Sequence, residues 1–585
     1  MKDPSVWLFF TFLALLSFVY LQDIDLNDES QTLFNESVRI QQAILERQSQ
    51  RNKSFRQIKK TYILNELTNK ILDLPVKDLI GKLQMRSLNA TQVLQAYIAR
   101  AIAVQDKFNC ITEFVPFALE RAQKLDKLNA VQGPLHGIPI CVKDDHDIIG
   151  MDTTLGLGKN LNEPASSNSV LVQSLMDLGA IIFCKTNIPQ TLFRFSSDNP
   201  IFGETLNYRN VKLAPGGSSC GTASLIGGGG AVFGTGTDIA GSVRIPAHFS
   251  GLSTLMPTIN RLSDKGIKRT LPQLVGLRGV PGVLANDIST VTYVFKALLT
   301  DATQNTYDAE ALPIPWDTKV FESRRPLRFG YYTSLSFFPA IGDTIATVLN
   351  AKTDLESLGH VFVPFKIEKD WDIVKLMNDV VAVDFGPESH FKKLFANEPP
   401  ARGLEMLRAN SWRSDARRRL DTCLSNVTKP GTSEYSARVS LLSQAGTDQH
   451  SDRDVWDMIY QKNQLTSKLL AQMEDHNLDL ILAPAFPFAA CRINDTEALF
   501  GATEYTMIWN FVDFPAGVIP FGEESGQNID NYNDEGDALL RLAKESTKES
   551  IGSPIGVQII GKPFKEELVL RALNELSNRK SSSLI

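Results

Sequence analysis

LAPGGSSCGTASLIGGGGAVFGTGTDIAGSVRIP, residues 213–246, is the segment that the rest of this chain supports. It holds ten glycines between positions 216 and 241, and Asp238 is its only charged side chain before Arg244. Glycine lets the backbone approach other groups closely and take positive φ. A loop with so few side chains leaves backbone N–H groups free to stabilise a developing oxyanion. A flexible linker is the alternative. Linkers do not usually contain adjacent apolar residues such as Leu225-Ile226, or an aspartate and an arginine on either side of a serine, as Asp238 and Arg244 stand here.

Two serine centres lie in this segment, the pair Ser218–Ser219 and the single Ser242. Residues 217–221 match the G-x-S-x-G elbow of α/β-hydrolases, which needs a strand directly before it and a helix directly after it. Residues 207–215 are polar and end on a proline, so they predict no strand. The elbow also needs a histidine base. The later histidines have surroundings typical of surface or packing positions: His360, His390, His450 and His476.

The composition of the 585 residues is that of a globular enzyme, with 43% hydrophobic and 22% charged residues. A net charge of −6 argues against nucleic acid as a partner, and the only basic triple, residues 417–419, is typical of a solvated helix face. No phosphate-loop or zinc-protease motif occurs, so we expect no metal and no cofactor. The six cysteines have no C-x-x-C spacing, which argues against zinc and against a disulfide framework. They are Cys110, Cys141, Cys184, Cys220, Cys423 and Cys491.

Strand and helix patterns alternate around the glycine-rich segment. Residues 138–143 form a short apolar run that predicts a strand ending on a lysine. Residues 169–178 predict an amphipathic helix, and 180–184 a fully apolar strand. This alternation indicates an α/β architecture. No clean linker divides residues 70–577, so we predict one domain there, with the polar stretch 523–550 as a surface excursion.

Several motifs together resemble the amidase signature family over about residues 70–577. Within this family the sequence is most similar to the fatty-acid amide hydrolases, particularly the membrane-anchored type 2 enzymes. The resemblance implies a large mixed, twisted β-sheet covered on both faces by α-helices. It also implies hydrolysis of a hydrophobic, fatty-acid amide-like substrate through an acyl-enzyme. The motifs that carry it lie at residues 134–139, 142–144, 185–190, 199–203, 216–219, 236–246 and 554–558.

What the resemblance implies for the chemistry is a Ser–cis-Ser–Lys triad. By position, Ser242 would be the nucleophile, Ser218 the bridging serine on a cis peptide, and Lys143 a base that starts neutral. A lysine can act as a base only if its pKa, about 10.4 in water, is lowered by burial or by neighbours. The position of Lys143 at the end of an apolar strand suits burial. Asp144 and Asp145 would oppose the shift if they faced it.

The resemblance further assigns an oxyanion hole to the backbone N–H groups of four consecutive residues, Ile239, Ala240, Gly241 and Ser242. Asp238, Arg244 and Ser219 would support this loop. Cys220 and Ala240 stand where the family pattern has glycine. An alanine forced to positive φ would cost about 1–2 kcal/mol, so we expect a slow or specialised enzyme if the loop demands that φ. Two alternatives stay open: an inactive paralogue that binds lipid amides, and an amidotransferase-type subunit.

Residues 6–21 form an uncharged run of sixteen residues near the N-terminus. The run is shorter than the roughly 20 residues of a typical span, but no small-residue cleavage site follows it. We therefore expect residues 1–22 to be an uncleaved membrane anchor rather than a removed signal peptide, and membrane lipid to be a partner. Residues 23–69 read as a polar helical stalk. A homodimer is left open.

Charge around the anchor predicts the location of the protein. Lys2 precedes the run and the next basic residue is Arg39, which weakly favours a lumenal catalytic domain on the endoplasmic reticulum. If the N-terminus is cleaved, the protein is instead secreted. Five glycosylation sequons are compatible with either location and decide nothing, because such triplets arise by chance. They begin at Asn35, Asn52, Asn89, Asn426 and Asn494.

Overall fold

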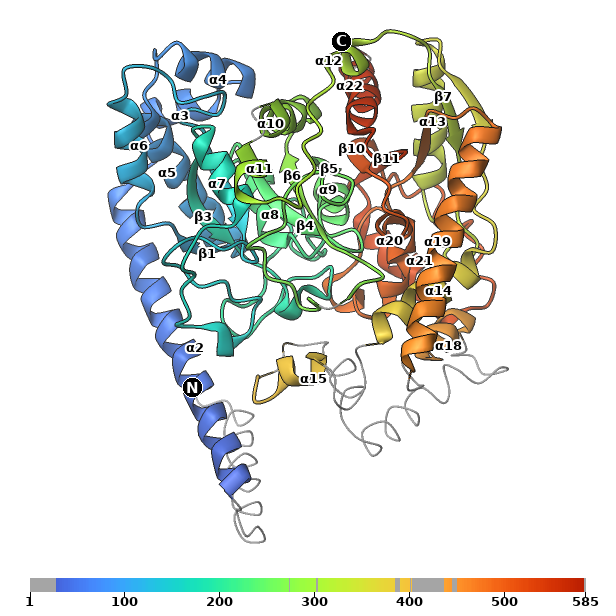
Figure 1. Ribbon diagram of the computed structural model, residues 1–585, viewed down its shortest axis with the longest axis horizontal. Coiled ribbons are helices and arrows are strands. Elements are labelled where there is room, and N and C mark those ends of the chain that lie inside the picture. The colour runs from blue at the N-terminus through green and yellow to red at the C-terminus, as the bar shows by residue number, and fades with distance from the viewer. Residues whose placement is uncertain are drawn as a thin grey trace.

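Figure 1 shows the computed structural model of the chain. It describes residues 28–272, 274–300, 303–383, 390–399, 401, 436–444 and 450–582. Four features expected from the sequence lie outside these residues: the anchor, the arginine triple, Cys423 and the sequon at Asn426.

Helices make up much of the described chain. The α-helices are α2 (Asp28–Thr61), α3 (Glu66–Leu72), α4 (Val76–Gln84), α5 (Ala90–Phe108), α6 (Ala118–Asp126), α7 (Val170–Asp177), α8 (Cys220–Gly227), α9 (Arg244–Ser250), α10 (Ile288–Thr300), α11 (Thr303–Tyr307), α12 (Thr318–Glu322), α13 (Thr344–Glu356), α14 (Asp370–Ala382), α15 (His390–Phe395), α18 (Ala437–Gln444), α19 (Asp452–Asp475), α20 (Glu504–Phe511), α21 (Ala538–Thr547) and α22 (Glu566–Ser582). Short 3₁₀ helices are η1 (Gly158–Asn160), η2 (Gln190–Leu192), η3 (Ile493–Asp495), η4 (Ala498–Thr503) and η5 (Lys548–Ser550).

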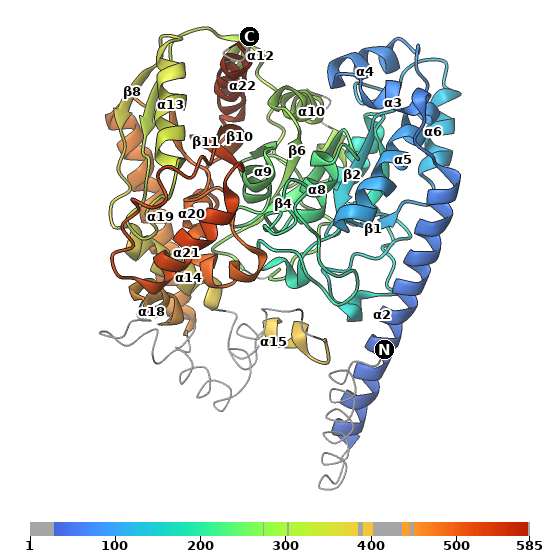
Figure 2. The same cartoon turned by 180° about the vertical axis from the view of Figure 1, so that it is seen from behind.

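One mixed sheet of 11 strands runs through the molecule in the order β1-β3-β2-β4-β6-β5-β10-β11-β9-β7-β8, and helices flank it (Figures 1 and 2). The expected α/β fold is confirmed. The strands are β1 (Ile111–Phe114), β2 (Pro139–Lys143), β3 (Ile181–Thr186), β4 (Phe233–Asp238), β5 (Ser253–Met256), β6 (Val280–Ala285), β7 (Arg328–Tyr331), β8 (Val361–Pro364), β9 (Leu480–Pro484), β10 (Ala516–Glu523) and β11 (Pro554–Gly561).

Strand β2 occupies the position that matters most for the chemistry. It lies between β3 and β4 and is parallel to both. All five of its residues are buried, as expected for a strand covered on both faces. The strand predicted over 138–143 is therefore confirmed. Because β2 and β4 are parallel, their carboxyl ends meet at the same edge of the sheet.

Helix α2 extends along one side of the molecule (Figure 1) and covers part of the region expected to be a stalk. Ile40 and Ile44 are buried against the loops of the main body. Arg47 forms ion pairs with Glu113 at 3.0 Å and with Asp152 at 2.6 Å. These contacts attach the helix to the sheet at β1. None of the described helices combines the length and the apolar character needed to span a bilayer.

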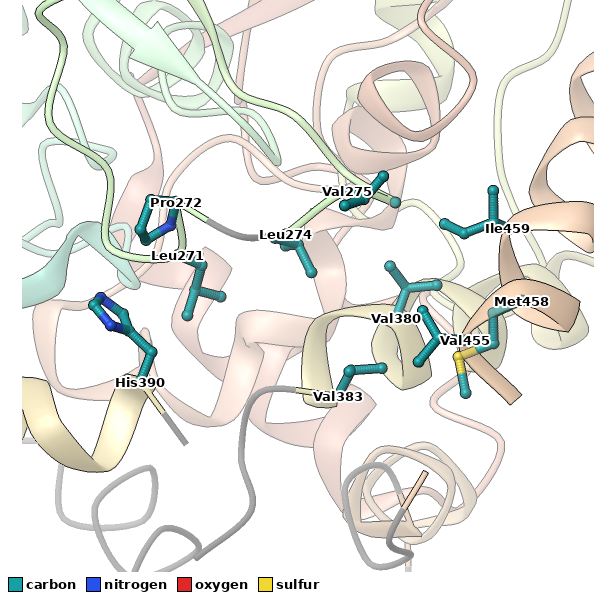
Figure 3. Close-up of a pocket in the computed structure, with 11 residues that line it drawn as sticks. Leu271, Pro272, Leu274, Val275, Val380, Val383, His390, Val455, Met458 and Ile459 are labelled. Atoms are coloured by element: carbon teal, nitrogen blue, oxygen red, sulfur yellow. The ribbon is translucent and has the colours of Figure 1, made fainter. Parts of the chain in front are cut away.

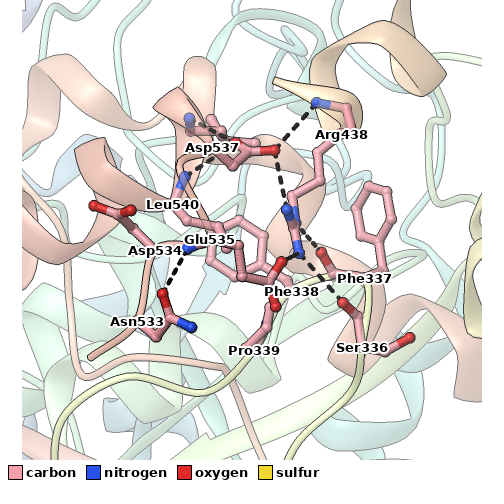
Figure 4. Close-up of polar contacts among 12 residues, drawn as sticks. Ser336, Phe337, Phe338, Pro339, Arg438, Asn533, Asp534, Glu535, Asp537 and Leu540 are labelled. Carbon is pink, nitrogen blue, oxygen red and sulfur yellow. Dashed lines mark hydrogen bonds and ion pairs between the residues drawn. The ribbon is translucent and has the colours of Figure 1, made fainter. Parts of the chain in front are cut away.

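The polar stretch 523–550 was expected on the surface, and many of its residues are exposed, although part of it also packs against the main body. It contains α21, an amphipathic helix that buries Leu539. Its acidic residues bind the buried Arg438 of α18, which donates to Asp537 at 2.9 Å and to Glu535 at 3.0 Å (Figure 4). Glu535 stays half exposed while it pairs with this buried cation.

Candidate active site

The candidate active site lies at the carboxyl ends of β2 and β4. Val142 of β2 is paired with Thr235 of β4, so the lysine that follows is placed beside the last residues of β4. Lys143 is fully buried, and its Nζ donates to Ser218 Oγ at 2.8 Å. It also donates to Thr237 Oγ1 at 2.8 Å. The structure thus brings together two residues that are 75 positions apart in the chain.

Burial lowers the pKa of Lys143 below its usual value, although the charge of Asp145 opposes the shift. The two aspartates after Lys143 behave differently. Asp145 faces the lysine, with 3.4 Å between its Oδ2 and Nζ of Lys143. Asp144 instead pairs with Lys185 at 2.8 Å. Only one of the two carboxylates therefore acts directly on the candidate base.

The peptide bond between Gly217 and Ser218 is cis, in the position that the resemblance implies. The next residue, Ser219, donates its backbone N–H to the carbonyl oxygen of Ser242 at 3.2 Å. This bond links the two serine centres through the backbone.

Ser219 itself does not have the surroundings of an elbow nucleophile. Its Oγ is buried and has no hydrogen-bond partner among the described residues. A β-carbon at Gly236 would lie 2.4 Å from this oxygen, so the hydroxyl packs directly on the β4 backbone. Residues 207–215 form no strand, as the sequence predicts. The elbow interpretation therefore lacks its preceding strand.

Asp238 organises the loop between β4 and α9. Its carboxylate accepts the backbone N–H of Gly241 at 2.8 Å and of Val243 at 3.1 Å. Arg244 adds two hydrogen bonds, from Nη2 at 3.0 Å and from Nε at 3.1 Å. Burial by itself would raise the pKa of the Asp238 carboxyl, but the Arg244 guanidinium and these bonds hold it below its usual value. The ionised carboxylate thus fixes the loop that carries Ser242.

The four expected oxyanion donors are not equivalent. Gly241 already donates its N–H to Asp238. Within the described part of the chain, the N–H groups of Ile239, Ala240 and Ser242 donate to no protein acceptor. Gly241 has φ of 122°, and a β-carbon there would lie 2.3 Å from Thr506 Oγ1. Its role is therefore to shape the loop, because only glycine fits this conformation and space.

Ala240 does not take positive φ. Its carbonyl oxygen accepts a hydrogen bond from Thr506 Oγ1 at 2.8 Å. The strain considered for this position is absent, so the alanine supplies no reason to expect a slow enzyme. Cys220, the other departure, is buried at the start of α8, and burial raises the pKa of its thiol to about 12. It is a neutral packing residue.

Sequence reasoning missed three residues of the site: Thr237, Thr506 and Asn510. Asn510 Nδ2 donates to the carboxylate and to the carbonyl oxygen of Asp238, both at 3.0 Å. Thr506 and Asn510 lie four residues apart on α20, so one face of this helix supports the loop. Both residues lie more than 260 positions from Asp238 in the chain, so no local sequence pattern predicts this contact.

An apolar cavity of about 200 Å³ lies between the segment that begins at Leu271 and the side chains of α14 and α19 (Figure 3). Gly279 lies shortly after the lining residue Gly276 in the chain. A β-carbon placed on Gly279 would lie 3.5 Å from Cβ of Ile239. One short segment therefore forms a wall of the cavity and contacts the loop that holds Ser242. The lining residues are Leu271, Pro272, Leu274, Val275, Gly276, Val380, Val383, His390, Val455, Met458 and Ile459.

Comparison with known proteins places this geometry in context. The family model described as Amidase matches residues 92–570. Fatty-acid amide hydrolase 1 of Sus scrofa is 31% identical over 532 residues, covering 86% of this chain and 86% of that protein. The Caenorhabditis elegans protein named fatty acid amide hydrolase 1 is 30% identical over 514 residues, which cover 86% of this chain and 87% of that protein.

Among solved structures, one titled "Fatty acid amide hydrolase" matches with a TM-score of 0.78 at 22% identity, over 94% of this chain and 97% of that one. At this identity the match speaks for the fold alone. Both sequence relatives carry the type 1 name, so a likeness to the type 2 enzymes in particular stays a prediction.

Proposed function

This chain belongs to the amidase signature family and is an amide-hydrolysing enzyme, and on that premise we propose that Ser242, Ser218 and Lys143 carry the reaction. The single observation that carries the proposal is the distance of 2.8 Å between Lys143 Nζ and Ser218 Oγ, over which a neutral lysine can accept the proton of Ser218. A buried lysine whose pKa is lowered is available as a neutral base. The N–H groups of Ile239, Ala240 and Ser242, which have no acceptor in the described part of the chain, supply donors for an oxyanion.

The proposed reaction proceeds in two stages. Ser242 Oγ bonds to the amide carbon while its proton moves to Ser218 Oγ and the proton of Ser218 moves to Lys143 Nζ. The negative charge on the carbonyl oxygen meets the N–H groups of the loop. The proton then returns by the same route to the leaving nitrogen as the C–N bond breaks. Water hydrolyses the resulting ester, which releases the acid and restores Ser242.

For the substrate, we propose a hydrophobic amide of the fatty-acid amide kind. The cavity is lined mainly by aliphatic side chains, among them four valines. Such a lining favours an alkyl or alkenyl chain, because burial of apolar surface is worth about 25 cal/mol per Å². Two sequence relatives are named fatty-acid amide hydrolases, which agrees with this substrate class.

A fluorophosphonate probe tests the proposed nucleophile. We expect the full-length protein to be labelled, and mass spectrometry of its peptides to place the adduct on Ser242, because such probes react with activated serines. Heat-denatured protein is the control. An adduct on Ser219 would revive the elbow interpretation. No labelling at all would indicate an inactive binding protein.

The membrane anchor at residues 1–22 also remains a proposal, and it rests on the uncharged run at 6–21. We expect the full-length protein to stay in the membrane pellet after a carbonate wash, and a chain lacking residues 1–22 to be released in large part. The predicted location on the endoplasmic reticulum, the membrane lipid partner and the homodimer rest on the sequence in the same way. Release of the full-length protein by carbonate would contradict the anchor.

A further inference from the structure

A buried pair of side chains, Asp145 and His146, lies directly behind the candidate base and has no part in the three-residue mechanism. Both residues are completely buried. Asp145 Oδ1 lies 2.6 Å from His146 Nδ1, and its Oδ2 lies 3.4 Å from Lys143 Nζ. Thr237 Oγ1 connects the two, because it accepts from Lys143 and donates to Asp145. Asp145 is thus joined to the lysine both directly and through a threonine.

The direction of the hydrogen bonds follows from the chemistry of the groups. An ionised carboxylate only accepts, so His146 Nδ1 carries the hydrogen that points at Asp145. His146 Nε2 is buried and has no partner among the described residues. A second proton placed there would be buried without an acceptor, which is unfavourable. His146 therefore donates to Asp145 and orients its carboxylate.

The other charged or titratable side chains near Lys143 are Asp238 and Cys220. Asp238 is paired with Arg244 at 3.0 Å. The thiol of Cys220 is neutral, because burial raises its pKa to about 12. In the described part of the chain, Asp145 is the carboxylate within ion-pair distance of Lys143.

Resting on the proposed function, we infer that Asp145, oriented by His146, stabilises the positive charge that Lys143 gains when it takes the proton from Ser218. Asp145 and His146 are positioning residues, since neither contacts the substrate. The carboxylate stands behind the lysine as the aspartate of a Ser-His-Asp triad stands behind its histidine. It keeps the buried lysine basic enough to accept a proton, while burial keeps it neutral before the reaction.

The test is the pH dependence of the labelling rate of Ser242 by the fluorophosphonate probe, measured on the full-length protein. In Asp145→Asn the lysine loses a nearby negative charge, which favours its neutral form. We therefore expect the acid limb of the rate to move to lower pH by about 1–3 units. The plateau at high pH should fall about tenfold or more, because a weaker base accelerates the attack less.

Asp144→Asn is the matched control, since it is the same substitution at the neighbouring buried aspartate, which pairs with Lys185 instead. We expect its acid limb to coincide with that of the wild type. The inference is overturned if the wild type is labelled but the acid limb of the pH–rate profile is unchanged in Asp145→Asn. It is also overturned if the acid limb moves equally in both variants. Absence of labelling in the wild type would instead overturn the proposed function.

Two variants of His146 keep the inference testable if Asp145→Asn does not fold, which thermal unfolding would reveal. His146→Phe removes the donor to Asp145, and we expect a lower labelling plateau. His146→Asn offers an amide N–H near the position of Nδ1, so it should restore much of the rate. Equal plateaus in the two variants would contradict the role of His146.

Discussion

Ser242→Ala is expected to abolish hydrolysis of amides and of esters alike, with kcat/KM falling about 10⁶-fold, the scale of nucleophile removal in a serine protease. Without the hydroxyl no acyl-enzyme forms with either substrate. The loop should keep its shape, because its support comes from Asp238 and Thr506, and neither bonds to the Ser242 side chain. The measurement is kcat/KM for a long-chain amide and for the ester of the same acid.

Ser219→Ala is the matched control for this substitution. The Ser219 hydroxyl has no hydrogen-bond partner in the described part of the chain, and the backbone N–H that links the serine centres is retained. This variant should keep far more activity than Ser242→Ala. The opposite ranking, an active Ser242→Ala beside an inactive Ser219→Ala, would show that the nucleophile has been assigned to the wrong serine.

Lys143→Ala is expected to depress amide hydrolysis much more than ester hydrolysis. In the proposed mechanism the lysine first takes the proton of Ser242 through Ser218 and then returns it to the departing group. An amine cannot leave as its anion, so amide cleavage depends on the returned proton, whereas an alkoxide leaves more readily. General acid–base help is worth about 10²–10⁴-fold, so the amide-to-ester ratio of kcat/KM should fall by a large part of that factor.

The ester is the internal control for Lys143→Ala, because it has the same acyl chain as the amide. Ser218→Ala should change the ratio in the same direction with a smaller loss if water bridges the gap left by the hydroxyl. Thermal unfolding of each variant shows whether the fold is retained. Equal losses for amide and ester would mean that Lys143 only activates the nucleophile or only holds the structure.

Local patterns in the sequence predict the parts of the site that lie close together in the chain. The apolar run before Lys143 predicts the buried strand β2, because a strand covered on both faces is apolar throughout. The glycine-rich segment predicts a loop of backbone donors, and the N–H groups of Ile239, Ala240 and Ser242 have no acceptor among the residues that the structure describes. The family motifs add the fold, and the family model matches residues 92–570.

The structure alone decides how the charges around the base are arranged. Strand β2 ends at Lys143, so strand periodicity does not extend to the next two residues. Their sequence leaves open which aspartate faces the lysine, and packing turns Asp145 toward it and Asp144 toward Lys185. The chemistry of the base depends on this choice, because a charge acts strongly only within a few ångströms in a buried site.

The supports of the nucleophile loop are likewise decided by tertiary structure. Thr506 and Asn510 belong to a helix more than 260 residues beyond Asp238, and they reach the loop only because the sheet and its helices fold together. The sequence by itself determined the helices and strands near the site and the motifs that carry its reactive groups, since these depend on neighbours along the chain. Tertiary packing decided which residues distant in sequence become hydrogen-bond partners. It brings buried polar groups together because each of them must form a hydrogen bond.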